Sequence, residues 1–212
     1  MRIAGVDEAG RGCVIGPLVI AGVLVDEEAQ AKLQEISVKD SKLLSPLTRE
    51  KLYPQIRRIA ERVISLSVSP VEIDRVVFAG VKFRRLNWLE AQKMAKIIDM
   101  LNPELVYVDA PDIFEDRFKQ QILENSRLKP PVIAEHHADR TYPAVSAASI
   151  IAKVERDHAI AQLKKKLGNF GSGYPSDPAT IRFLQEYAAK TEMLPNTVRR
   201  SWKTVKKLRA ES

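Results

Sequence analysis

The sequence predicts an α/β fold, in which a mixed β-sheet is covered by helices. Two apolar runs separated by a tight turn open the chain, at residues 2–8 and 14–25, and favour a pair of adjacent strands. Two later runs of the buried-strand type, at 105–108 and 131–134, each follow a segment with helical spacing. Strands that alternate with helices in this way are typical of layered α/β domains.

The other elements follow from the spacing of apolar residues and from the residues that interrupt it. Residues 63–68 alternate well enough to form a further strand. Leu52, Ile56, Ile59 and Val63 recur at helical spacing, and Pro54 among them favours either a kink or a helix that begins there. Further helices are predicted at 26–34, 73–78, 86–101, 114–123, 144–167 and 177–189.

We place a domain boundary near residue 169. Residues 1–168 hold the predicted strands and form the α/β core, whereas residues 169–212 form a basic helical extension that packs on that core. Trp202 in this extension could stack on a base or pin the last segment to the core, and the sequence favours neither. The cations around it are expected to contact nucleic-acid phosphates: Arg199, Arg200, Lys203, Lys206, Lys207 and Arg209.

Composition narrows the class of partner and the compartment. A net charge of +7 and a pI near 9.5 favour a polyanionic partner such as nucleic acid. No apolar run approaches the roughly 20 residues of a membrane span, and the acidic pair near the N-terminus leaves no room for a signal peptide. We therefore expect a cytoplasmic protein without a membrane partner. Cys13 is the only cysteine, which excludes an internal disulfide and a thiolate zinc site, and we expect it to be a small buried side chain.

Three aspartates share a position relative to the predicted strands. Asp7 and Asp109 stand at the C-terminal ends of apolar strands, and Asp139 lies a few residues past another. Ligand sites in α/β sheets favour that edge. Each acid alone reads as well as a strand end or a helix cap, but several carboxylates at one edge would repel one another unless a cation lies among them. Oxygen ligands of this kind suit Mg²⁺ or Mn²⁺.

Glu8 directly follows Asp7, and neighbouring residues on a strand face opposite ways. Both acids can join one site only if the strand ends there, which the sequence Ala9-Gly10 makes plausible. His136 and His137 could serve as ligands or proton shuttles near Asp139, although a structural role is favoured.

A Gly-Arg-Gly turn follows the acidic pair. Gly10 and Gly12 permit positive φ angles and let a phosphate or another backbone come close, and Arg11 adds a cation. The turn is not a nucleotide-binding loop, because its glycine spacing differs from the dinucleotide fingerprint and a strand, not a helix, follows it. A turn of this kind beside carboxylates suits a site that holds metal ions and a phosphate.

The block Ile-Ala-Gly-Val-Asp-Glu-Ala-Gly-Arg-Gly at residues 3–12 resembles the opening motif of ribonuclease HII, the type 2 ribonuclease H family. Further blocks resemble the same family and occur in the family order: Lys39–Leu43, Tyr107–Ala110, Ala138-Asp139, Val145–Lys153 and Gly171–Pro175. The resemblance thus extends over most of the chain. It implies a ribonuclease H-like fold, with a central mixed five-stranded sheet flanked by helices and a C-terminal helical extension.

The resemblance also implies an activity. Such a protein is a metal-dependent endonuclease that cuts the RNA strand of RNA–DNA hybrids and cuts beside ribonucleotides embedded in duplex DNA. It leaves 5′-phosphate and 3′-hydroxyl ends. These two nucleic acids are the partners that the resemblance implies, and a monomer is expected.

Site residues carry over position by position. The resemblance assigns the catalytic and metal-binding roles to four acids: Asp7, Glu8, Asp109 and Asp139. They would hold two Mg²⁺ or Mn²⁺ ions, with Asp7 as the candidate that bridges both. The motif that grips the ribonucleotide through backbone contacts matches Gly10, Arg11 and Gly12, and the tyrosine that stacks on the neighbouring sugar matches Tyr174. The candidates for phosphate contacts are Lys42, Ser146 and Lys153.

Two other classes of function compete with this one. A different metal-dependent nuclease on the same fold, such as a junction resolvase or an exonuclease, would share the acids but would leave the Gly-Arg-Gly turn and Tyr174 without a role. A non-catalytic nucleic-acid binding module would explain the basic tail but not the acids, because carboxylates repel phosphate.

Overall fold

The computed structural model describes residues 1–36, 44–81, 85–191 and 193–210. Five strands form one sheet in the order β3-β2-β1-β4-β5. Their bounds are β1 Ile3–Ala9, β2 Leu18–Val25, β3 Arg62–Val68, β4 Leu105–Asp109 and β5 Val132–Glu135. β1 pairs antiparallel with β2 and parallel with β4, and β4 pairs parallel with β5, so the predicted mixed five-stranded sheet is confirmed.

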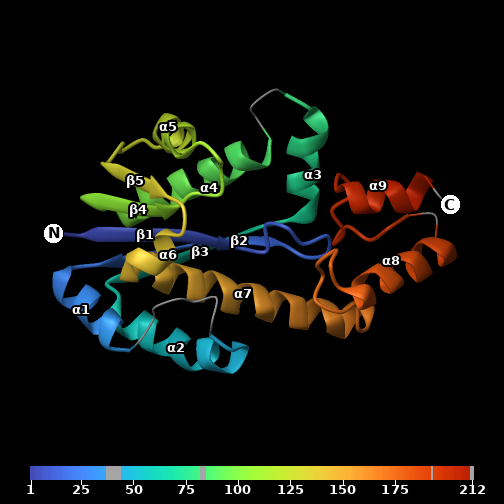
Figure 1. The fold of residues 1–212 in the computed structure, drawn as a ribbon, viewed down its shortest axis with the longest axis horizontal. Helices are drawn as coiled ribbons and strands as arrows, with labels where there is room; N and C mark the ends of the chain where they lie inside the picture. Colours follow the sequence, from blue (N-terminus) through green and yellow to red (C-terminus); the bar gives the residue numbers. More distant parts are fainter. Residues whose placement is uncertain (37–43, 82–84, 192, 211–212) are drawn as a thin grey trace. The chain divides into compact units, whose positions relative to one another are not determined.

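Helices cover both faces of this sheet (Figure 1). One face carries α4 (Leu86–Leu101) and α5 (Glu115–Asn125), and the other carries α1 (Glu27–Glu35), α2 (Pro46–Ile59) and the N-terminal half of α7 (Pro143–Leu167). Every residue of β2 is buried, because both of its faces are covered. Alternate β2 residues join the buried side chains of α1, α2 and α7 in one apolar cluster, among them Val19, Ala21, Val23 and Val25.

The chain divides into two compact units. The first unit contains residues 1–9, 19–66 and 87–155, and the second contains residues 10–18, 67–86 and 156–212. Segments of the second unit come from both sides of residue 169, and the predicted domain boundary there stays a prediction. Within the described residues, no helix is long and apolar enough to cross a membrane.

The second unit has a core of its own. Its helices are α3 (Pro70–Ala79), the C-terminal part of α7, α8 (Pro178–Lys190) and α9 (Lys203–Ala210), so the C-terminal extension is helical, as predicted. Ile15 forms an isolated antiparallel bridge with Val198. The core consists of buried apolar residues from all its segments: Val14, Ile15, Ile160, Phe170, Leu184, Leu194, Val198 and Val205.

Several local structures differ from the sequence-based expectation, and α3, predicted at 73–78, begins at Pro70 because Ser69 caps it. β2 begins at Leu18 and not at residue 14, because Ile15 pairs with Val198 and Gly16 has a φ of 95°. α2 begins at Pro46, where the Ser45 side chain caps it by accepting the Thr48 N–H, and it continues through Pro54. The short helix α6 (Ala138–Thr141) was not predicted.

Gly5 lets α7 approach β1 closely. A Cβ on Gly5 would overlap the backbone of Ala144 and Val145 at the start of α7. We expect Gly5→Ala to destabilise the protein by about 3 kcal/mol, because backbone atoms cannot move aside without displacing the helix. Gly12→Ala is the matched control, since its Cβ would have one neighbour, Tyr174 Cε1, at 3.9 Å. Equal unfolding midpoints of the two variants in denaturant would contradict this account.

Candidate active site

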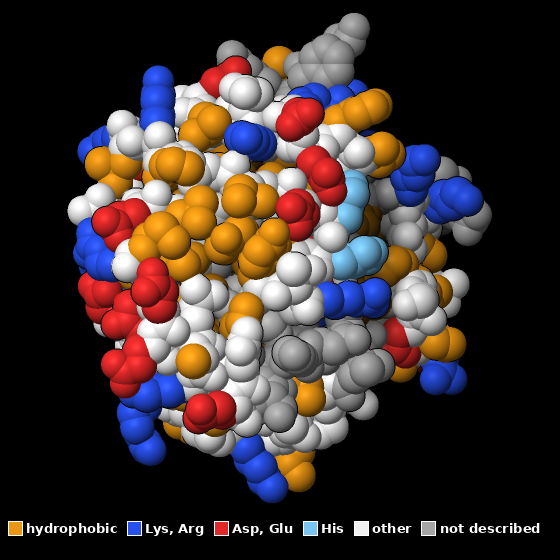
Figure 2. Space-filling model, turned by 60° about the vertical axis from the view of Figure 1, so that its left-hand side comes forward, with side chains coloured by type: hydrophobic (Ala, Val, Ile, Leu, Met, Phe, Trp, Pro, Cys, Tyr) orange, Lys and Arg blue, Asp and Glu red, His pale blue; other side chains and the backbone are white. Residues whose placement is uncertain are grey.

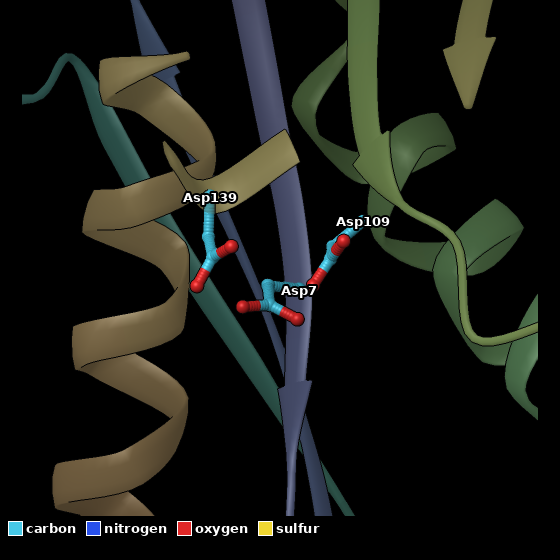
Figure 3. A group of neighbouring side chains, drawn as sticks. All are labelled: Asp7, Asp109 and Asp139. Carbon is cyan, nitrogen blue, oxygen red and sulfur yellow. The ribbon is translucent and has the colours of Figure 1, made fainter. Parts of the chain in front are cut away.

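Three aspartates from separate elements converge in the first unit. Asp7 lies on β1, Asp109 ends β4 and Asp139 lies on α6, and their side chains point toward one another (Figure 3). Each contributes a carboxylate oxygen to a group whose members all lie within 4.8 Å of one another. Asp7 and Asp139 are buried, at 4% and 1% exposure. We call these three residues the aspartate cluster.

The sheet explains why these acids meet. β1 and β4 run parallel in a register that pairs Val6 with Val108, so the next residues along, Asp7 and Asp109, emerge side by side. Beyond β5, His137 adopts a left-handed conformation with a φ of 60°, and the chain turns into α6. The Ala138 N–H donates to Asp109 Oδ1 at 3.2 Å, which ties the start of α6 to the end of β4.

The pKa of Asp7 is raised to about 7, first by burial of the carboxyl group and then by the negative charge of Asp109. Three weaker effects lower the pKa: a hydrogen bond from Ser149, the Glu8 N–H that donates to Asp7 Oδ1 at 2.6 Å, and the positive charge of Lys153. Burial outweighs these effects because a buried carboxylate loses its hydration, which disfavours its charged form. A cation bound in the cluster would remove this penalty.

The donor set fits a divalent metal ion. Hard, oxygen-seeking ions such as Mg²⁺ and Mn²⁺ bind carboxylates, and three carboxylate oxygens within 4.8 Å of one another can share such an ion. The raised pKa of Asp7 points the same way, because the protein alone does not compensate the charge that this site concentrates.

Glu8 is not part of the aspartate cluster among the described residues. β1 continues to Ala9, one residue past Glu8, so the strand ends close to the acidic pair but not at it. The role of Glu8 as a fourth ligand stays a prediction. Of the three candidates for phosphate contacts, Ser146 is buried, Lys153 is half-buried with its charge felt at Asp7, and Lys42 lies outside the described residues.

The Gly-Arg-Gly turn and Tyr174 lie together in the second unit. Gly10 has a φ of 85°, which is the left-handed conformation that the sequence suggested. Gly12 does not, and its importance is spatial, since a Cβ there would face Tyr174 Cε1 at 3.9 Å. The N–H groups of Val14 and Ile15 both donate to Gly173 O, at 2.7 and 3.1 Å, and so fasten the loop that carries Tyr174 beside the turn.

Comparison with known proteins assigns the chain to a family. The family model for ribonuclease HII matches residues 4–205. The chain belongs to the ribonuclease HII family. It is 49% identical over 210 residues to ribonuclease HII of Pyrococcus furiosus, covering 98% of this chain and 91% of that protein.

Solved structures agree with this assignment. The crystal structure of ribonuclease H2 from Pyrococcus horikoshii matches with a TM-score of 0.91 and 46% identity, over 100% of this chain and 98% of that one. Ribonuclease HII from Archaeoglobus fulgidus, solved in a complex with PCNA, matches with a TM-score of 0.86 and 46% identity, over 96% of both chains.

The structure gives Ser149 and Arg156 contacts that the sequence analysis did not assign, and it changes the role expected of Arg199. Ser149 bonds Asp7, the guanidinium of Arg156 lies 4.8 Å over the ring of Tyr174, and Arg199 is fully buried. For Arg199 the expectation of a phosphate contact is wrong, because its guanidinium bonds backbone carbonyls of residues 10–16. The available signal for Ser149 was helical spacing, which places it four residues before Lys153 on α7.

His136 and Trp202 have structural contacts. His136 Nδ1 lies 3.0 Å from Ala110 O, and its backbone N–H donates to Glu115 Oε1 at 2.6 Å. His136 and His137 are exposed, and Figure 2 shows histidine side chains at the surface beside acidic and basic ones. Trp202 packs against the core of the second unit, with the guanidinium of Arg199 5.0 Å from its ring. The contacts of His136 are of the structural kind that we favoured, and the role of His137 stays a prediction.

We expect Asp7→Asn to stabilise the metal-free protein at neutral pH. Since the pKa of Asp7 is about 7 in the folded state and 3.8 otherwise, the folded state binds more protons between these values, and stability falls as the pH rises through that window. The variant lacks this loss, so its advantage over wild type should grow by about 3 kcal/mol between pH 5 and pH 8. Denaturant unfolding in EDTA at both pH values measures it.

The control is Asp116→Asn, which removes an exposed carboxylate from the first turn of α5. Saturating Mg²⁺ should stabilise wild type and the control but not Asp7→Asn, because the ion binds the folded cluster. A pH-independent difference between wild type and Asp7→Asn would contradict the raised pKa.

Proposed function

We propose that this chain is a metal-dependent endonuclease that hydrolyses the RNA strand of RNA–DNA hybrids. It also cuts at ribonucleotides embedded in duplex DNA and leaves 5′-phosphate and 3′-hydroxyl ends. The observation that carries the proposal is the aspartate cluster, three carboxylates within 4.8 Å in a chain of the ribonuclease HII family. The net charge of +7 supports a polyanionic substrate.

The acids hold and orient the metal. Asp7 is central, because it lies on the middle strand β1, and it is our candidate to contact two ions, with Asp109 and Asp139 on either side of it. Glu8 is the proposed fourth ligand. Two bound Mg²⁺ or Mn²⁺ ions would supply an activated water and would stabilise charge on the leaving 3′-oxygen. Ser149 and the Glu8 N–H orient the Asp7 carboxylate, and Lys153 places a positive charge nearby for a phosphate oxygen.

The turn at residues 10–12 and Tyr174 read the sugar. The 2′-hydroxyl is the group that distinguishes a ribonucleotide from a deoxyribonucleotide at one position, so a selective site must contact it. Backbone groups of the turn can approach a sugar closely at Gly12, where a Cβ would have one neighbour, Tyr174 Cε1 at 3.9 Å. The ring of Tyr174 lies beside Gly12 and 4.8 Å from the Arg156 guanidinium, and we propose that it stacks on the neighbouring deoxyribose.

Asp109→Asn should abolish cleavage while the protein still folds. The change keeps the size of the side chain and removes a charge, so we expect the rate on RNA–DNA hybrid to fall by roughly 100-fold or more, as when a group that stabilises transition-state charge is lost. Rates are measured on a hybrid, a duplex with one ribonucleotide, a four-way junction and plain DNA, with and without Mg²⁺ or Mn²⁺. Asp116→Asn should keep the wild-type rate, because Asp116 is exposed on α5.

Two results would overturn the assignment. Near wild-type cleavage by Asp109→Asn would remove Asp109 from the reaction. Cleavage of the four-way junction in preference to both ribonucleotide substrates would make the chain a resolvase.

Tyr174→Ala should lose far more activity on a single embedded ribonucleotide than Tyr174→Phe, because phenylalanine keeps the ring that stacks on the sugar. Gly12→Val should harm all ribonucleotide substrates alike, since its side chain would fill the space in front of Tyr174. The measurement is the ratio of cleavage rates on single-ribonucleotide and all-RNA substrates, beside thermal melts. A Tyr174→Ala protein that melts early and keeps the wild-type ratio would leave the tyrosine with a packing role alone.

A further inference from the structure

We propose that Arg199 is a positioning residue that holds the turn at residues 10–16 in the conformation that reads the ribose. The inference rests on the proposed function, because it explains how the ribonucleotide-reading turn acquires its shape. Arg199 lies between 183 and 189 residues in sequence from the turn residues that it bonds, and its side chain bonds their backbone carbonyls.

The contacts between Arg199 and the turn are unusually complete. Nη1 donates to Arg11 O at 2.6 Å, and Nη2 donates to Gly10 O at 2.7 Å. Nε and Nη2 both donate to Gly16 O, at 3.2 and 3.1 Å. In return the Arg199 backbone N–H donates to Val14 O at 2.9 Å. Carbonyls from both ends of the turn therefore converge on one guanidinium.

Because the peptide bond is planar, the directions of these carbonyls also fix the directions of the N–H groups that follow them. In a trans peptide unit the C=O and the following N–H point in opposite directions. Because Arg199 draws the carbonyls of Gly10 and Arg11 toward itself, the N–H groups of Arg11 and Gly12 point away from it. Two successive amides aimed to one side form a small concave donor pair that can bind an oxygen. We assign to this pair the contact with the ribose hydroxyl or its phosphate.

The choice of arginine follows from geometry. A guanidinium is a rigid planar fork of five donors, so it can satisfy several carbonyls at fixed angles, whereas the ammonium of lysine is a single point on a flexible stem. Arg199 is 0% exposed, and a buried charge is costly unless it is well bonded. The position of the fork is itself fixed, because Asp74 of α3 accepts the N–H groups of Arg200 and Ser201 at 2.8 and 2.9 Å.

The second arginine has a separate task. Arg156 is 6% exposed, its Nη2 donates to Ser172 O at 3.2 Å, and its guanidinium lies over Tyr174. A Cβ on Gly10 would meet Arg156 Nε and Cδ, so this side chain packs on the turn without shaping its carbonyls. Arg156 supports the tyrosine and Arg199 supports the amides.

The test compares Arg199→Lys, Arg199→Ala and a matched control, Val205→Ala. Val205 is fully buried in the core of the same unit, so its truncation loosens that core without removing a bond to the turn. The first readout is the pair of amide chemical shifts of Arg11 and Gly12 in ¹⁵N–¹H spectra. The second is kcat/KM on single-ribonucleotide and all-RNA substrates, with Mn²⁺ binding to the aspartate cluster measured by calorimetry.

We expect both Arg199 variants to move these two amide shifts and to lose roughly 100-fold in kcat/KM on both substrates, the size of effect that a misplaced binding group produces. Mn²⁺ affinity should be unchanged. Millimolar guanidinium should restore activity severalfold to Arg199→Ala, since the ion fits the vacated site, and should restore none to Val205→Ala.

Three results would overturn the positioning role. The first is an Arg199→Lys enzyme with wild-type kcat/KM. The second is an Arg199→Ala enzyme with unchanged Arg11 and Gly12 shifts. The third is a loss of activity in Val205→Ala as large as that in Arg199→Ala at equal thermal stability. Failure of the proposed function has a different signature: wild type cleaves neither ribonucleotide substrate, while the amide shifts still respond to Arg199.

Discussion

The site in the first unit depends on one constraint, the burial of the Asp7 carboxylate on the central strand. Elsewhere in this sheet the neighbours of β1 are apolar, and β2 beside it is buried throughout. A carboxylate placed in that setting is costly, and Asp109 and Asp139 within 4.8 Å make the cost greater. Ser149, Lys153 and the Glu8 N–H reduce it without removing it. The arrangement is therefore complementary to a cation, and without one the buried carboxylates lower the stability of the fold locally.

Much of the first unit could be predicted, because its signals are local. Asp7 and Asp109 each end an apolar strand, and parallel strands bring such residues to one edge of a sheet without further information. The same reasoning was less complete for Glu8, since whether β1 ends at residue 8 or at Ala9 depends on pairing with β2 as far as Val19. The end of a strand depends on its pairing with neighbouring strands, and the local sequence of one strand does not reveal that pairing.

The second unit was harder, because its decisive contacts join distant segments. Residues 14–17 look like the start of a strand, yet Ile15 pairs with Val198 and Gly16 bonds to Thr197 O. Arg199 lies in a basic segment whose composition is typical of a phosphate-binding tail, but its side chain is completely buried. Charge patterns reveal that a cation is present. Whether it meets a phosphate or a set of carbonyls is decided by burial, which no local pattern encodes.

The close approach of α7 to β1 has a consequence for acid–base chemistry. Gly5 and Asp7 lie two residues apart on β1 and so face the same side, toward α7. Gly5 lets the backbone of Ala144 rest against the strand, and the same helix presents Ser149 and Lys153 to Asp7. The absence of a side chain at Gly5 thus sets the short distance between α7 and β1. A larger residue at position 5 would move the Ser149 hydroxyl and the Lys153 ammonium away from Asp7 together. The proton affinity of Asp7 would then rise although no ionisable group had changed.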